Sequence, residues 1–187
     1  MRIIGGEARG RRLFAPSGND TRPTSDRTRE SLFNILSFDV PGSIVLDLFG
    51  GTGALALEAL SRGAEFACVS DKSPQAVKMI ERNAAIVLGS ETKDKISIVC
   101  ADYKKALSLF RGRKFNLVFL DPPYAMEEAY GESVQKMIEC GMLTEDAIVI
   151  MERVKSAKIT LPQEMEIFDT RDYRDTVIDF VRWREET

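Results

Sequence analysis

Ile44-Val45-Leu46-Asp47-Leu48-Phe49-Gly50-Gly51-Thr52-Gly53 is the stretch that decides the fold class of this 187-residue chain. Its apolar run, residues 44–48, has the length and branching of a buried parallel strand. Three glycines within positions 50–53 break the run, and residues 54–60 then indicate a helix with almost no polar face. Strand, glycine turn and buried helix together open a nucleotide-binding α/β fold, in which a ligand lies against bare backbone.

The same stretch leaves two cofactors open. Asp47 is a carboxylate in an apolar strand, and because burying it unpaired would be costly, we expect it near the carboxyl end of the strand. Residues 51–56 also fit the G-x-G-x-x-G/A dinucleotide pattern, and Asp71 follows Gly51 by 20 residues, where a ribose-binding acid is expected. A nicotinamide-dependent dehydrogenase and an S-adenosylmethionine (AdoMet) methyltransferase would both contain this pattern.

The rest of the chain alternates predicted strands and helices. We expect helices at 27–37, 54–60, 74–88, 103–110 and 127–140, with strands at 44–48, 66–71, 96–100, 115–120 and 147–152. Residues 164–169 and 176–183 alternate with period 2 and indicate a terminal antiparallel pair. This order predicts one α/β domain over 1–187, with a seven-stranded, mostly parallel sheet covered on both faces. Residues 1–26 should form a basic arm or hairpin followed by a loop.

The formal net charge of −3 is unevenly distributed. Residues 1–29 carry seven arginines against three acids, a balance of +4, so the other residues carry −7. Arginine gathered on one segment of an acidic protein favours a surface for RNA or DNA phosphate. Charge alone leaves a second interpretation open, which is a solvated structural arm.

Several functions are excluded or disfavoured by what the sequence lacks. It contains no histidine, which removes histidine general bases, the serine and cysteine triads that need them, and most zinc sites. Cys68, Cys100 and Cys140 lie far apart beside apolar elements, so we expect buried thiols and no metal site. No apolar run reaches the length of a membrane span, and no apolar signal core is present, so we expect a cytoplasmic protein without membrane partners.

Acidic residues lie at the carboxyl ends of four of the predicted strands: Asp47, Asp71, Asp102 and Asp121. The carboxyl ends of parallel strands form the rim where open α/β sheets bind ligands. Core packing does not explain acids at four such positions.

The segment Asp121-Pro122-Pro123-Tyr124 selects the chemistry. Two prolines remove two backbone N–H groups, so the segment presents an acid and carbonyls with no amide hydrogen competing for them. Such an array suits the exocyclic amine of a base, and the ring of Tyr124 can stack on that base. A strand-ending turn with a core tyrosine is the alternative, but the acid before the prolines and the aromatic after them favour the functional interpretation.

At this point the chain resembles a known family. VLDLFGGTG, Asp71, Asp102 and LDPPY match, in order and spacing, the motifs of Rossmann-like class I AdoMet-dependent amino-methyltransferases. Together with MRIIGGEARGRRL and RPTSDRTRESLFNIL they resemble the RsmD family of bacterial 16S rRNA guanine-N2 methyltransferases over essentially the whole chain. Gly50 replaces a frequent alanine, which we expect to be harmless, and Arg174 stands where a glycine is common.

The resemblance implies methylation of guanine 966 in 16S rRNA within an assembled or assembling small ribosomal subunit. AdoMet would be the cofactor. Its methionine part would be held by Asp47 and the turn glycines, its ribose by Asp71 and its adenine amine by Asp102; those glycines are Gly50, Gly51 and Gly53.

The resemblance also assigns the target side of the site. Asp121 and the Pro122 carbonyl would accept hydrogen bonds from the guanine N2 amine, and Tyr124 would stack on the base. For RNA phosphate we expect the arginines of the N-terminal segment: Arg9, Arg11, Arg12, Arg22 and Arg27. We expect a monomer.

Three rival interpretations stay open. A DNA adenine-N6 methyltransferase could use the same four-residue motif. A nicotinamide-dependent dehydrogenase fits the glycine turn but leaves Asp121-Pro122-Pro123-Tyr124 without a task. An RNA-binding assembly factor without catalysis would not need the complete motif set.

Overall fold

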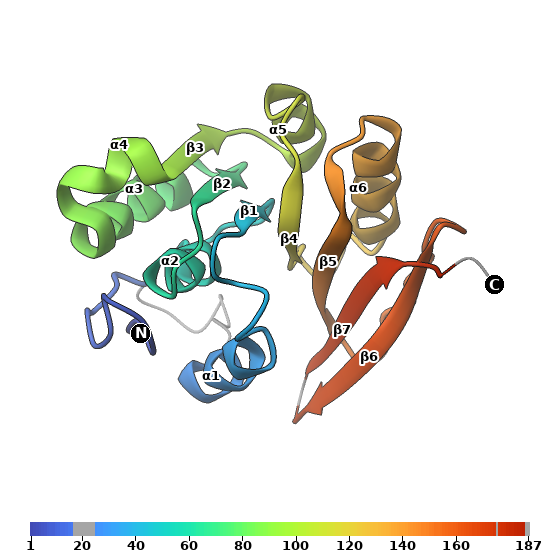
Figure 1. The fold of residues 1–187 in the computed structure, drawn as a ribbon, viewed down its shortest axis with the longest axis horizontal. Helices are drawn as coiled ribbons and strands as arrows, with labels where there is room; N and C mark the ends of the chain where they lie inside the picture. Colours follow the sequence, from blue (N-terminus) through green and yellow to red (C-terminus); the bar gives the residue numbers. More distant parts are fainter. Residues whose placement is uncertain (17–24, 175, 186–187) are drawn as a thin grey trace.

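The computed structural model describes residues 1–16, 25–174 and 176–185, and within them the chain forms a seven-stranded sheet (Figure 1). The spatial order is β3-β2-β1-β4-β5-β7-β6. Neighbours from β3 to β5 pair in parallel, whereas β7 is antiparallel to both β5 and β6. The strands are β1 Ile44–Asp47, β2 Phe66–Asp71, β3 Ile96–Cys100, β4 Phe115–Leu120, β5 Leu143–Val154, β6 Met165–Tyr173 and β7 Thr176–Trp183.

Helices cover both faces of the sheet. Figure 1 places α1 to α4 and the N-terminal arm on one face, with α5 and α6 on the other. Their bounds are α1 Asp26–Ile35, α2 Ala54–Ser61, α3 Pro74–Leu88, α4 Thr92–Lys95, α5 Tyr103–Leu109 and α6 Glu128–Glu139, with a 3-10 turn η1 at Gly89–Glu91. No helix among the described residues is both long and apolar enough to span a membrane.

The buried side chains form two layers, one on each face. Val45 and Phe119 belong to the layer under α1, α2 and α3, whereas Leu46 and Val118 belong to the layer under α5 and α6. Successive residues of a strand point to opposite faces, so a strand buried on both faces needs an uninterrupted apolar run. The predicted seven-stranded, mostly parallel sheet and its terminal antiparallel pair are confirmed.

Some predicted boundaries were wrong. The strand expected at 147–152 runs from Leu143 to Val154, because Leu143 pairs with Phe115 and the Trp183 indole donates to the Thr144 carbonyl at 2.7 Å. Residues 143–146 are therefore part of the strand because of their contacts with neighbouring strands, although their own polar sequence did not indicate a strand. The helix expected at 27–37 is Asp26–Ile35, and the helical turns over 89–95 were not predicted.

The first 13 residues fold back on themselves. Arg2 and Arg12 form an antiparallel bridge, and the Ile3 N–H donates to the Arg11 carbonyl at 3.0 Å. Ile3 is completely buried, so the arm contributes to the core as well as carrying charge.

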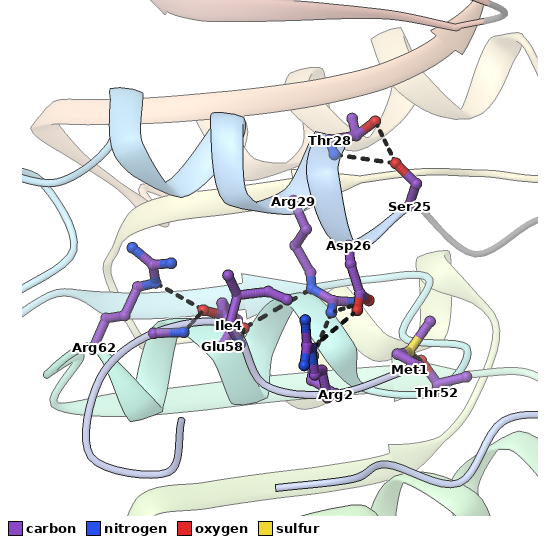
Figure 2. A network of polar contacts seen from close by, with 11 residues as sticks. Met1, Arg2, Ile4, Ser25, Asp26, Thr28, Arg29, Thr52, Glu58 and Arg62 are labelled. Carbon is purple, nitrogen blue, oxygen red and sulfur yellow. Dashed lines mark hydrogen bonds and ion pairs between the residues drawn. The ribbon is translucent and has the colours of Figure 1, made fainter. Parts of the chain in front are cut away.

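Glu58 in the middle of α2 anchors this arm (Figure 2). Its side chain is completely buried, and its two oxygens accept from the backbone N–H groups of Ile4 and Gly5, each at 2.8 Å. The Arg62 guanidinium donates at 2.8 Å, and Arg29 of α1 places Nε 3.9 Å from the carboxylate. One carboxylate thus joins the arm, α1 and α2.

Arg29 is a structural residue. It is 1% exposed, and it donates to Asp26 at 3.0 Å and to the Arg2 carbonyl. The positive balance of residues 1–29 therefore overstates the charge that can meet an external partner.

Candidate active site

Three acids share one side of the sheet rim. Val45, Val69 and Phe119 all face the layer under α1 to α3. Because strand side chains alternate with period 2, the residues two positions further along, Asp47, Asp71 and Asp121, project toward the same side. Asp47 is in register with Val69 on β2 and with Phe119 on β4, so the three strand ends are adjacent.

The surroundings of the Asp47 side chain favour its neutral, protonated form. The residue is 3% exposed, and loss of hydration raises the pKa of its carboxyl from 3.8 to about 7. Backbone amides of Phe49 and Ala56 partly oppose this rise, whereas the charge of Asp71 adds to it. No lysine or arginine within the described ranges forms an ion pair with it.

The turn requires glycine for two different reasons, which are backbone conformation and close packing. Gly51 and Gly53 have φ angles of +55° and +77°, which side chains other than glycine rarely adopt. Gly50 has an ordinary φ, but a Cβ there would lie 2.5 Å from Val69 Cγ1 and 2.9 Å from Ile80 Cδ1. An alanine at position 50 would therefore displace buried neighbours, so the glycine suits the packing of this chain.

Asp71 and Asp102 also hold the backbone of the rim. Asp71 accepts from Gly51 N at 2.9 Å and from Ser73 N at 2.8 Å, which fixes the glycine turn against β2. Asp102 caps α5 by accepting from Lys105 N at 2.9 Å. Carboxylate oxygens have further lone pairs, so these bonds leave both acids able to accept from a ligand.

The segment after β4, residues 121–124, contains both a buried and an exposed residue. Pro122 is buried, whereas the Tyr124 residue is 62% exposed. A core tyrosine, the alternative considered for this motif, is therefore wrong. The ring is available for stacking.

Asp121 keeps exposed surface, but the protein around its carboxyl excludes much of the water. Desolvation, followed by the nearby charges of Glu152 and Asp47, raises the pKa of Asp121 well above its ordinary value. Of these two neighbours, Glu152 was not singled out by sequence reasoning. The available signal was an acid ending the apolar run of β5, in the same way that Asp121 ends β4.

The predicted RNA-binding arginines have different surroundings. Arg9, Arg11, Arg12 and Arg27 are all exposed. Of these, Arg11 also donates to the carbonyls of residues 86 and 87 at the end of α3, at 2.6 and 3.0 Å, so it fastens the arm to the domain. Arg22 lies outside the described residues.

Two of the three cysteines are not buried as expected. Cys68 is buried in β2, whereas Cys100 is exposed at the end of β3 and Cys140 is partly exposed after α6. Among the residues that the structure describes, no group of three or more histidine, cysteine or acidic side chains could hold a metal ion.

Comparison with known proteins shows the family. The protein-family description "Conserved hypothetical protein 95" matches residues 1–182. The ribosomal RNA small subunit methyltransferase D (RsmD) of Escherichia coli is 34% identical over 163 residues, which cover 87% of this chain and 79% of that protein. This chain belongs to the RsmD family.

Other RsmD-like proteins match over nearly the full length. YlbH of Bacillus subtilis, which carries the name of an rRNA methyltransferase, is 34% identical over 189 residues, 100% of this chain and 93% of YlbH. The solved structure of the Escherichia coli protein YhhF superposes with a TM-score of 0.83 at 28% identity and covers 98% of this chain and 97% of that one. The RsmD-family chain thus has the class I methyltransferase fold, and its family favours methyl transfer over the dehydrogenase interpretation.

Proposed function

We propose that this protein transfers the methyl group of AdoMet to the N2 amine of a guanine in 16S rRNA, at nucleotide 966. The acceptor array after β4 carries the proposal: the Asp121 carboxylate and the Pro122 carbonyl, beside the exposed ring of Tyr124. The names of the relatives support small-subunit rRNA as the substrate. We propose that it works in the cytoplasm on the rRNA of assembled or assembling subunits, and the experiment below compares these with naked rRNA. Every proposed site residue comes from one chain, so a monomer suffices.

The rim fits the cofactor on three counts. Asp47 is a carboxylate whose pKa is raised by burial, and the ammonium of the methionine part would supply a cation that favours its charged form. Gly51 is exposed and presents backbone without a side chain. Asp71 and Asp102 keep lone pairs for the ribose hydroxyls and the adenine amine.

The residues of this chain would act mainly by alignment. When bound, AdoMet would supply an electrophilic methyl group for N2, and the electron pair of the broken carbon–sulfur bond would stay on sulfur. The N2 lone pair is delocalised into the guanine ring, so holding it in the direction of attack is the main task. Asp121 and the Pro122 carbonyl would accept the two N2 hydrogens, and Asp121 would take the proton that N2 loses.

The exposed arginines would hold the RNA around this site. Arg9, Arg12 and Arg27 are able to meet phosphate, whereas Arg11 keeps the arm in place. The target base must be out of a helix to reach Asp121, which suits a loop nucleotide.

Incubation with labelled AdoMet tests the proposal. Small subunits, naked 16S rRNA and duplex DNA are offered separately, and the labelled nucleotide is mapped. We expect label on N2 of guanine 966, with small subunits or naked rRNA revealing which form is used. Label on N6 of adenine in DNA would replace the proposal by its rival, and label on another rRNA guanine would change the target nucleotide.

A further inference from the structure

A narrow hollow lies beside Asp121, between α1 and the sheet. Its walls are apolar, and its polar side chains are two carboxylates, Asp121 and Glu152. The apolar walls are formed by Leu32, Leu55, Phe119, Leu120, Ile150 and Ile178.

The sheet register places these two carboxylates next to each other. Leu120 on β4 pairs in parallel with Met151 on β5, so Asp121 and Glu152 are the next residues of adjacent strands. Phe119 and Ile150 both face the layer under α1, and Asp121 and Glu152 therefore share that side.

The backbone at Glu152 is fixed from two directions. Its Cα is in register with Ile178 on β7, and its carbonyl accepts from the buried Tyr130 hydroxyl on α6. The closeness of the two carboxylates is also seen in the pKa of Asp121, since Glu152 is the strongest nearby charge that raises it.

We propose that Glu152 is a specificity-determining residue that accepts the N1–H of the target guanine while Asp121 and Pro122 accept the N2 amine. The inference rests on the proposed function. It names the group that would make the site prefer guanine to adenine.

The chemistry of the bases supports this division. Guanine carries hydrogen-bond donors on N1 and N2, which are bonded to the same carbon, and two adjacent carboxylates can accept hydrogen bonds from them. Adenine carries an unprotonated N1 next to its amine, and a carboxylate facing that lone pair is repelled. The repulsion, together with the loss of the N1–H hydrogen bond, would disfavour adenine at this contact.

A base analogue separates this contact from the methyl-accepting amine. 2-Aminopurine keeps the N2 amine but has a bare lone pair at N1. Small subunits are reconstituted with 16S rRNA carrying guanine or 2-aminopurine at the methylated nucleotide, and kcat/KM is measured for each. The parent should prefer guanine by about tenfold to a hundredfold.

Glu152→Gln should reduce that preference at least tenfold, because an amide N–H can donate to the bare N1 of 2-aminopurine. Glu145→Gln is the matched control, since Glu145 lies exposed at the opposite end of β5. Its preference should equal that of the parent. AdoMet affinity and melting temperature are recorded for both variants.

The outcomes are distinguishable. A parent that does not methylate guanine N2 at all contradicts the proposed function. A parent that methylates guanine and 2-aminopurine equally well overturns the role of Glu152 without any variant. An unchanged preference in a folded Glu152→Gln protein, even with both rates lowered, also overturns it.

Discussion

Glu58 in α2 and Asp47 at the end of β1 are both carboxylates removed from water, being 0% and 3% exposed. Glu58 is surrounded by donors: two backbone N–H groups, the Arg62 guanidinium and, slightly further away, Arg29. Asp47 has backbone amides nearby, no cation among the described residues, and a second acid, Asp71, close enough to raise its pKa. The described residues therefore supply cationic partners for Glu58 but none for Asp47.

The difference shows which buried charge serves structure and which serves a ligand. Charge inside a protein is costly unless it is paired, so a site selected for stability alone would supply a partner. Around Glu58 the partners come from three separate segments and fasten them together. At the rim, no lysine or arginine of the described ranges pairs with Asp47 or Asp121, which is expected if the cofactor and the target base supply the positive or hydrogen-donating groups.

Removing the Glu58 charge should have the largest effect. Glu58→Gln leaves the buried Arg29 without its second carboxylate, and breaking a buried pair typically costs about 3–5 kcal/mol. Denaturant unfolding should show this loss, whereas Glu65→Gln, on the exposed surface after α2, should unfold like the parent. A loss below about 1 kcal/mol would mean that the arm is held by packing alone and would weaken the contrast with Asp47.

Asp47→Asn should change stability in the opposite direction. The folded protein holds the Asp47 proton up to a pH of about 7, whereas an unfolded carboxyl releases it near 3.8, so this group makes the fold less stable as pH rises between those values. Above pH 7 the free energy of unfolding of the variant should therefore be larger than that of the parent by up to about 4 kcal/mol, since one pKa unit corresponds to about 1.4 kcal/mol.

The gap between Asp47→Asn and the parent should close as the pH falls toward 4, since the parent then becomes neutral as well. Unfolding curves at several pH values measure this. The exposed Asp94→Asn is the control and should show no such gap. If the Asp47→Asn protein were less stable than the parent at every pH, Asp47 would be a carboxylate that stabilises the fold, as Glu58 does, and the contrast between them would be wrong.

Asp121 should affect rate and leave the fold unchanged. Asp121→Ala removes the group that orients the amine, and misplacement of a reacting group costs on the order of a hundredfold in rate. Asp121→Asn should lose less, because its amide oxygen still accepts a hydrogen bond. Single-turnover methyl transfer at saturating AdoMet, beside melting curves, measures both, and a parental rate for the alanine variant would remove Asp121 from the mechanism.

The two kinds of arm arginine should give the smallest and most easily separated effects. Arg9→Ser with Arg12→Ser should weaken RNA binding and flatten its dependence on salt by about 0.7 per lost phosphate contact, without lowering the melting temperature. Arg11→Ser should lower the melting temperature, because it loses two carbonyl contacts at the end of α3. Identical behaviour of both proteins would contradict the division between them.

The fold could be predicted because its signals are local. Apolar runs bounded by glycine and proline mark the strands, and an acid after each run marks the rim. The extension of β5 to residues 143–146 depends on pairing with β4, which no window of sequence contains.

The anchoring network was beyond sequence reasoning for a similar reason. Glu58 stands out as an acid in an apolar helix. Its partner Arg62 is four residues away, but the partners that join α2 to other segments lie 29 residues away at Arg29 and more than 50 away in the arm. The prediction for the arginines treated them as equivalent because composition carries no information on burial. Only the docked arm shows that Arg29 is buried and that Arg11 binds the end of α3, whereas Arg9 and Arg12 are exposed.

The claim that Asp47 is kept for a cationic ligand is tested most directly by counting protons when AdoMet binds. At pH 6 the carboxyl of the free protein should be mostly protonated, because its pKa is about 7. Binding of the ligand ammonium would favour the ionised form, so calorimetry in buffers of different ionisation enthalpy should record release of close to one proton, declining as the pH rises through 7. AdoMet binding without proton release at pH 6 would contradict the account.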